Sequence, residues 1–372
     1  MPSSEPYDPT GVEYYTIPTF TFASGTTLHD LKVAYRSFNP SSTAGVVLIP
    51  TCYGGLINTT LTLTTAPNDA LAKYHVVVAA MLGNGESSSP SNKQFFPQPG
   101  ELRYQDVVNA HYKMLTDHLH VKDLEAVIGF SMGAQQAYHW AVMYPEFVKR
   151  IVPICGSART SPHNYAFLEG PVGAMTNSID YIAWKAMKQK LANGEDVGQN
   201  LKELTPKRGL KVFGRAYSAW LMSHAWFRER HWADKDSGFG QAKSVEEWIK
   251  AREEGFLGWD AEDLLVLARM WQMGDVGGVI AGQEGELSQL GGAVPNDEQY
   301  EKALGSIKAK ALVMPCRTDQ YFPPEDSEIE MKYLKAGTFA PIESVWGHVA
   351  GGGANPKDVE FMNEKIGQFM KE

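Results

Sequence analysis

Short runs of apolar, mostly β-branched residues recur in the first and last parts of the chain, and turn-forming residues bound each run. The runs are continuous rather than alternating, which is typical of strands that are buried on both faces of a parallel sheet. They cover residues 46–51, 75–81, 125–130, 150–155, 310–316 and 342–346. We therefore predict a mainly parallel sheet from these runs, with hairpin strands from residues 12–38 at one edge.

Stretches with the period of an amphipathic helix separate these runs. The clearest of them are residues 103–119 and 132–145, which lie before and after the run 125–130. Strands that alternate with helices in this way form βαβ units. The pattern predicts an α/β fold in which helices flank the sheet.

This alternation stops after residue 155 and resumes at residue 310. The segment between them has helical periodicity at 179–194, 243–255 and 260–274, and residues 282–299 predict a long loop. It also contains most of the tryptophans: Trp184, Trp220, Trp226, Trp232, Trp248, Trp259 and Trp271. These aromatic residues either form the core of a helical cap or line an apolar substrate cleft. We predict a core domain from residues 1–157 and 305–372, with a cap insertion at 158–304.

Size and charge limit the classes of function. A chain of 372 residues is long enough for a large core and a second unit. Its net charge of −9, with no long cluster of Lys or Arg, argues against binding to nucleic acid or to anionic membranes. The first residues lack the pattern of a signal peptide and no long apolar window is present, so we expect a cytoplasmic protein.

The cysteines indicate neither a disulfide framework nor a metal site. Cys52, Cys155 and Cys316 are few and widely separated, and their spacing matches no zinc pattern. We expect reduced thiols and no metal.

The sequence GFSMG, residues 129–133, places a serine between two glycines where a predicted strand meets a predicted helix. This is the setting of a nucleophile elbow, in which a sharp turn exposes the serine and leaves no room for side chains at the flanking positions. The following helix directs free N–H groups at developing negative charge. We therefore predict that Ser131 is a nucleophile rather than a small residue at a tight turn.

A serine nucleophile needs a base, and the base needs an acid that orients it. In this arrangement the acid and the histidine follow the serine, each just after a late strand. Asp319 follows the run 310–316, and His348 follows the run 342–346. We predict Asp319 and His348 for these roles, with Glu325 and Asp326 as competing acids.

An oxyanion hole needs two N–H donors. The N–H of Met132 is one, and the loop 49–58 after an early strand supplies the other, from Cys52 or alternatively Tyr53. Gly54 lets the backbone approach a ligand closely, so we include Tyr53 and Gly54 among the substrate-binding residues. Cys52 as an alternative nucleophile lacks a histidine beside it in the sequence.

Residues 102–119 and 129–164, with DQYFPP at 319–324 and the Gly-His pair at 347–348, are similar to the homoserine O-acetyltransferase family of α/β-hydrolase proteins. The resemblance implies an α/β-hydrolase fold with an inserted helical cap, an acyl-serine intermediate and the triad Ser131, Asp319 and His348. It also implies a homodimer formed through the cap.

The sequence departs from that family next to the predicted histidine. In the homoserine enzymes that this sequence resembles, an aspartate directly follows the catalytic histidine and contacts the substrate ammonium. Here that position is Val349, which is followed by alanine and three glycines. The elbow has GFSMGAQ in place of GGSMGG. These differences resemble the esterase-like and secondary-metabolism branches of the family, and Val349 is predicted to contact the substrate.

These features predict an enzyme that transfers an acyl group from an ester or thioester to Ser131 and then to water or an alcohol. We expect a small-molecule substrate and no cofactor, with acyl-CoA or another thioester as a possible donor. Alternatives are a homoserine-type O-acetyltransferase, release or lactonisation of a carrier-bound polyketide chain, and a non-catalytic binding module. The last would have lost a triad residue, and no such loss is seen in the sequence.

Overall fold

An eight-stranded sheet forms the centre of the computed structural model, which describes residues 9–64, 70–195, 205–235, 239–281 and 297–372. The strand order is β1-β2-β4-β3-β5-β6-β7-β8. The pairs from β4 to β8 are parallel, whereas β1 pairs with β2, and β2 with β4, in antiparallel fashion. The predicted parallel sheet and its N-terminal edge hairpin are therefore confirmed. The strands are β1 (Glu13–Thr21), β2 (Thr27–Phe38), β3 (Val46–Pro50), β4 (His75–Ala79), β5 (Ala126–Phe130), β6 (Arg150–Ile154), β7 (Lys310–Val313) and β8 (Gly337–Phe339).

The prediction of a last strand at residues 342–346 is wrong. The final strand β8 lies earlier in the chain, and Ile342 makes only an isolated bridge to Cys316. Ser344 turns away from the sheet, since its hydroxyl donates to Asp358 and its carbonyl accepts from the Thr318 hydroxyl. These side-chain bonds compete with strand pairing and give a loop that leads to His348.

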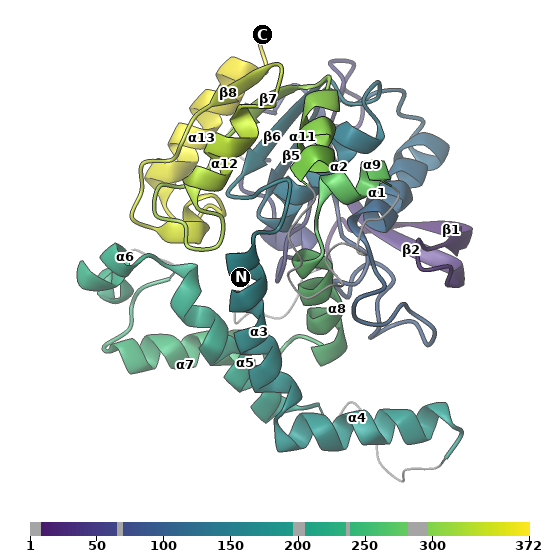
Figure 1. The fold of residues 1–372 in the computed structure, drawn as a ribbon, viewed down its shortest axis with the longest axis vertical. Helices are drawn as coiled ribbons and strands as arrows, with labels where there is room; N and C mark the ends of the chain where they lie inside the picture. Colours follow the sequence, from purple (N-terminus) through teal and green to yellow (C-terminus); the bar gives the residue numbers. More distant parts are fainter. Residues whose placement is uncertain (1–8, 65–69, 196–204, 236–238, 282–296) are drawn as a thin grey trace.

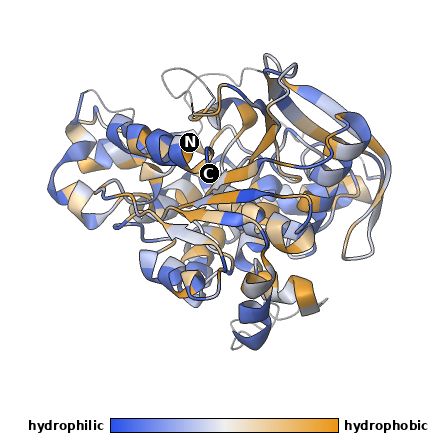
Figure 2. Cartoon of the chain, turned by 90° about the horizontal axis from the view of Figure 1, so that it is seen from above, coloured by the Kyte–Doolittle hydropathy of each residue, from blue (hydrophilic) through white to orange (hydrophobic). Residues whose placement is uncertain are grey.

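Helices cover the sheet as the periodicity predicts. The core helices are α1 (Tyr104–Lys113), α2 (Met132–Met143), α12 (Pro324–Met331) and α13 (Pro356–Phe369), and a π-helical turn, η2 (Met114–His118), follows α1. Helix α2 packs against β3, β5 and β6 and is almost completely buried. In Figure 2 the strands in the middle of the molecule carry the hydrophobic colours that this burial requires.

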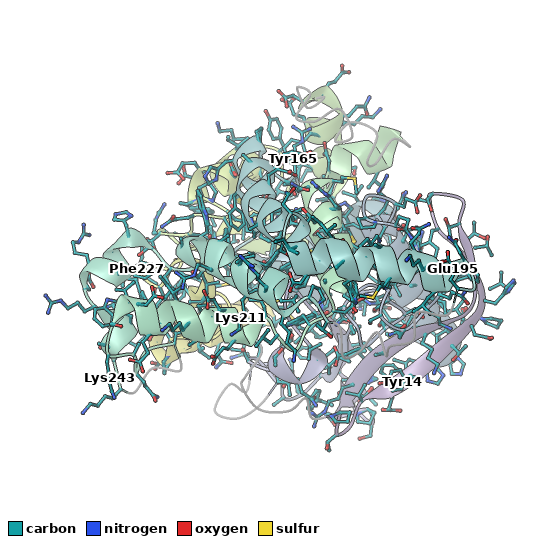
Figure 3. The ribbon with its side chains drawn as sticks, turned by 90° about the horizontal axis from the view of Figure 1, so that it is seen from below. Tyr14, Tyr165, Glu195, Lys211, Phe227 and Lys243 are labelled. Atoms are coloured by element: carbon teal, nitrogen blue, oxygen red, sulfur yellow. The ribbon has the colours of Figure 1, made fainter. Side chains whose placement is uncertain are left out.

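The segment between β6 and β7 is helical, and Figure 1 shows α3 to α8 gathered on one side of the sheet, with α4 projecting away from the others. We call α3 to α8 the cap. Its helices are α3 (Pro162–Thr176), α4 (Ile179–Ala192), α5 (Lys207–Leu221), α6 (His224–Arg228), α7 (Val245–Gly255) and α8 (Ala261–Gln272), with the 3-10 turn η4 (His231–Ala233). In Figure 3, Glu195 marks the end of the α4 arm, and Lys211 and Phe227 mark α5 and α6.

The C-terminal part of the predicted cap range behaves differently. Helices α9 (Val276–Ala281) and α11 (Asp297–Ser306) pack against each other and against α2 of the core. The predicted loop 282–299 lies outside the described residues up to residue 296, and α11 begins at Asp297. The insertion 158–304 therefore contains the cap helices and two helices that belong with the core.

Most of the cap tryptophans are packing residues. Trp184, Trp226, Trp248 and Trp271 are buried, and Trp226 and Trp248 contact each other and Phe227. This favours the interpretation in which the aromatic residues form the core of the cap. Among the described helices, none is long and apolar enough to span a membrane.

Candidate active site

Ser131 lies at the sharp turn from β5 into α2. Its backbone has φ 58° and ψ −123°, a strained conformation for a residue other than glycine. A Cβ atom at Gly129 would overlap the carbonyl of Gly133, and one at Gly133 would come within 2.8 Å of the Pro50 oxygen. The two flanking glycines are therefore required for the close packing of strand, turn and helix. The predicted strand-turn-helix setting of Ser131 is confirmed.

His348 connects Ser131 with Asp319. Its Nε2 lies 2.9 Å from Ser131 Oγ, and its Nδ1 lies 2.8 Å from Asp319 Oδ2. A carboxylate accepts the Nδ1 proton, so Nε2 is left to accept the proton of the Ser131 hydroxyl. All three side chains are buried. The structure thus brings together, from three separate loops, the residues that the sequence predicted as nucleophile, base and acid.

Asp319 is fixed by the backbone that follows it. Its Oδ1 accepts hydrogen bonds from the N–H groups of Tyr321, at 2.8 Å, and Phe322, at 3.2 Å. These bonds hold the carboxylate so that Oδ2 faces the imidazole. The competing acids Glu325 and Asp326 lie on α12, where Glu325 is exposed. Burial raises the pKa of Asp326, and in the described part of the chain its Oδ2 has no hydrogen-bond partner.

Aromatic rings hold the imidazole from several sides. The ring centroids of Phe130 and Tyr321 each lie 4.7 Å from that of His348, and that of Phe322 lies 5.7 Å away. Phe130 precedes the serine in the elbow. A Cβ atom at Gly352 would come within 3.1 Å of the Phe130 ring, so the glycines after His348 make room for this ring. The sequence analysis did not predict Phe130 as a site residue. The signal for it was the phenylalanine at the position where GGSMGG has its second glycine.

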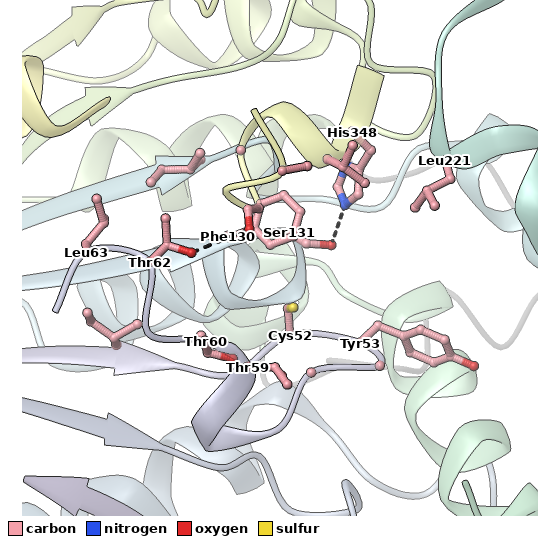
Figure 4. A pocket seen from close by; sticks show the side chains of 18 of the residues that line it. Cys52, Tyr53, Thr59, Thr60, Thr62, Leu63, Phe130, Ser131, Leu221 and His348 are labelled. Carbon is pink, nitrogen blue, oxygen red and sulfur yellow. Dashed lines mark hydrogen bonds between the residues drawn. The ribbon is translucent and has the colours of Figure 1, made fainter. Parts of the chain in front are cut away.

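The backbone N–H groups of Met132 and Cys52 are the candidate donors of an oxyanion hole. Within the described residues, neither of them donates to a backbone oxygen of another element. Figure 4 shows Cys52 close to Ser131 and on the opposite side from His348. Burial raises the pKa of the Cys52 thiol to about 11, which keeps it protonated at neutral pH and disfavours it as a nucleophile.

Tyr53 joins the oxyanion loop to the cap. Its hydroxyl donates to the backbone oxygen of Leu264 on α8 at 3.0 Å, and its ring stacks against Phe213 and Tyr217 on α5. Gly54, with φ 64°, turns the chain directly after it. Both predicted residues line the cavity described next.

A cavity of about 110 Å³ opens at Ser131. Val349 lies in its wall as predicted, and the cap contributes Tyr217, Leu221, Phe239 and Phe256. Among the described residues, the wall includes no Asp, Glu, Lys or Arg. The cavity therefore suits a small uncharged molecule.

The acidic residues of the cap lie outside this wall. Glu262 pairs with Lys185 and Lys188, and Asp260 caps the N-terminus of α8. Asp263 accepts hydrogen bonds from the backbone N–H and the hydroxyl of Ser91. Each has other partners, so none of them takes the place of the carboxylate that Val349 replaces.

Known proteins match this chain over most of its length. The model of the alpha/beta hydrolase fold family matches residues 45–175. An ethyl acetate hydrolase from Pseudomonas veronii is 30% identical over 346 residues, which are 91% of this chain and 89% of that protein. A homoserine O-acetyltransferase from Methanobrevibacter ruminantium is 26% identical, covering 88% of this chain and 67% of that protein. The solved structure of the acetyl esterase MekB is 28% identical, with a TM-score of 0.79 over 97% of both chains.

The fold and these relatives define an enzyme of ester hydrolysis or acyl transfer. The chain belongs to the α/β-hydrolase family. The resemblance to homoserine O-acetyltransferases and to their esterase-like relatives, which the motifs predicted, is confirmed.

Proposed function

We propose that this enzyme hydrolyses esters of short, uncharged acyl groups, with Ser131, His348 and Asp319 as its catalytic triad. The observation that carries the proposal is the small cavity at Ser131, whose described wall has no charged residue. The similarity to an ethyl acetate hydrolase and to an acetyl esterase supports an acetyl ester as the substrate.

The first half of the reaction acylates the serine. His348 Nε2 takes the hydroxyl proton while Ser131 Oγ attacks the ester carbonyl carbon, and Asp319 stabilises the imidazolium that forms. The N–H groups of Met132 and Cys52 donate to the oxyanion of the tetrahedral intermediate. His348 then gives the proton to the alcohol oxygen, the bond from carbon to this oxygen breaks, and an acyl-Ser131 ester remains.

The second half repeats these steps with water. His348 takes one proton from the water, whose oxygen attacks the acyl carbon, and then returns the proton to Ser131 Oγ as the carboxylic acid leaves. These steps use only side chains and backbone of the chain, and we therefore propose that the enzyme needs no cofactor. A short acyl thioester, including acyl-CoA, would enter the same sequence as donor.

Transfer to homoserine and release of a polyketide chain fit the site less well. An ammonium group buried without a carboxylate partner loses its hydration without compensation, and Val349 provides an apolar contact in place of that partner. A cavity of about 110 Å³ encloses only a short acyl group, so most of a long polyketide chain would lie outside it.

We propose further that the enzyme is a cytoplasmic homodimer formed through the cap. The support is an apolar stripe on the projecting helix α4, where Ile179 and Ile182 are 74% and 56% exposed. Large exposed apolar side chains on one helix face are typical of surfaces that contact another protein.

The test of the activity is intact-mass analysis after rapid mixing with acetate esters and with an acetyl thioester. We expect a transient mass increase of one acetyl group that is absent in Ser131→Ala, together with release of acetate. Turnover by Ser131→Ala at more than a tenth of the wild-type rate would contradict the proposed mechanism.

A further inference from the structure

The cavity has two unlike sides, and Ser131 lies between them. Figure 4 shows Leu221 and Tyr53 on one side of Ser131, and Thr59, Thr60 and Thr62 on the other. This division bears on how an ester is oriented, because its acyl and alcohol groups extend in different directions from the carbonyl carbon.

The side toward the cap is closed and apolar. We call it the inner pocket; it consists of Tyr53, Tyr217, Leu221 and Phe256, and all four are buried. Phe239, a further cap residue in the wall, is half-buried. The Tyr53 hydroxyl is bonded to the Leu264 oxygen, so this side offers mainly carbon atoms to a substrate. Leu221 is the last residue of α5 and lies in the wall on this side of Ser131.

The other side reaches the surface and carries hydroxyl groups. We call it the rim; it consists of Thr59, Thr60 and Thr62 with Gly352 and Ala354, next to the buried apolar residue Leu63, which lies beside Thr62 in Figure 4. Thr59 and Gly352 are exposed, and the other three rim residues are half-buried. Thr62 Oγ1 lies 3.5 Å from the Gly352 oxygen, so the two segments meet here. Thr60 donates its proton to the Leu56 oxygen, which leaves lone pairs that accept from water or an alcohol.

The order of the chemical steps decides which group occupies which side. After acylation the acyl group stays bonded to Ser131, whereas the alcohol must leave and water must enter. A group that exchanges with solvent needs the open, hydroxyl-bearing side. The retained acyl group can occupy the closed side, where contact with Leu221 and Phe256 keeps water from its alkyl carbons.

Resting on the proposed ester hydrolysis, we infer that the inner pocket binds the acyl group and sets its length, while the alcohol leaves through the rim. Leu221 is then the residue that determines acyl specificity. Substrates with a short acyl group and a varied alcohol fit this orientation, and substrates with a long acyl group do not.

The wild-type enzyme tests the orientation without any substitution. One series varies the acyl group with a constant leaving group: p-nitrophenyl acetate, butyrate and hexanoate. The other varies the alcohol with a constant acyl group: the acetates of ethanol, butanol and hexanol. We expect kcat/KM to fall by about tenfold or more from acetate to hexanoate in the first series, and by less than about threefold in the second. The opposite dependence would overturn the inference while leaving ester hydrolysis intact, whereas no turnover of any ester would refute the proposed function itself.

Two variants test whether Leu221 sets the acyl-chain specificity. Leu221→Ala should raise kcat/KM for hexanoate relative to acetate by roughly tenfold, with the alcohol series unchanged. The milder Leu221→Val, which removes one carbon, should shift the ratio in the same direction if Leu221→Ala does not fold. Ile329→Ala at an exposed position of α12 is the control and should change neither ratio. An altered alcohol series with an unchanged acyl series in the Leu221 variants would contradict the assignment.

Discussion

In the core domain, Ser131, Asp319 and His348 are held by backbone geometry and hydrogen bonds, whereas Leu221 and Phe256 of the cap are held by packing. Ser131 has φ 58°, and the three core residues are joined at 2.8 and 2.9 Å. Neither Leu221 nor Phe256 carries a polar side-chain atom, and both are buried. Changes in the core should therefore alter the rate of any substrate, while changes in the cap should alter the choice of substrate.

Ser131→Ala tests the core side most severely. Alanine fits the elbow as serine does, because it adds no atom and meets the same backbone strain. We expect kcat/KM for acetate esters to fall on the order of 10⁴-fold or more, with an unchanged thermal midpoint. Steady-state assays and circular dichroism melting measure the two quantities, and an activity loss that comes with a lost fold would leave the comparison unsupported.

Asp319→Asn should have the next largest effect. The asparagine oxygen can keep the bonds from the N–H groups of Tyr321 and Phe322, so its NH2 group faces His348 Nδ1 and forces the proton onto Nε2. With that tautomer the imidazole accepts no proton from Ser131, and we expect kcat to fall by about 10³- to 10⁴-fold. Asp326→Asn is the control with the same chemistry on α12. A larger loss for Asp326→Asn would reverse the assignment of the acid.

Homoserine tests the apolar wall to which core and cap both contribute. With acetyl-CoA as donor, we expect kcat/KM for homoserine acetylation to be lower than that for cleavage of a neutral activated acetate ester by a factor of hundreds or more. The reason is that Val349 leaves the substrate ammonium unpaired, and an unpaired buried charge costs at least a few kcal/mol. Equal values of kcat/KM in the two assays would contradict the proposed esterase and support a homoserine O-acetyltransferase.

The smallest effect concerns a contact that joins the two regions. Asp263 on cap helix α8 accepts from Ser91 of a core loop, with Asp260 and Lys188 nearby. Burial, with a contribution from Asp260, raises the pKa of Asp263 to about 7, above the usual value of about 3.9. The folded state then binds a proton that the unfolded state lacks, so this stabilisation is present at low pH and is lost as pH rises from about 4 to 7.

Asp263→Asn removes that dependence. We expect the difference in unfolding free energy between wild type and variant to change by at most about 1.4 kcal/mol per pH unit in this window. Denaturant unfolding of both proteins at pH 5, 6, 7 and 8 measures the difference, and other buried carboxyls, such as Glu330, contribute equally to both. A difference that stays constant with pH would show that Asp263 does not titrate on unfolding.

The sequence predicted the core better than the cap for a physical reason. Ser131 and Asp319 each follow a buried strand within a few residues, and His348 follows a short apolar run, so local patterns identify them. Leu221 and Phe256 come to the cavity only through helix packing, which no local pattern specifies. Phe130 and the rim threonines were missed because their role depends on the glycines after His348, more than 200 residues away from Phe130 in the chain. The last strand was misplaced because side-chain bonds of Ser344 outweighed its apolar neighbours.

Cys52 and Tyr53 are consecutive residues that contact different parts of the molecule, so a displacement of Tyr53 also displaces Cys52. Tyr53 donates to the Leu264 oxygen of the cap, while Cys52, next to Ser131 in Figure 4, carries the N–H that we propose for the oxyanion. We therefore expect a movement of α8 away from the sheet to shift the short loop that carries this proposed donor. An ester too bulky for the cap to close over it would then react at Ser131 with one of the two proposed oxyanion donors displaced.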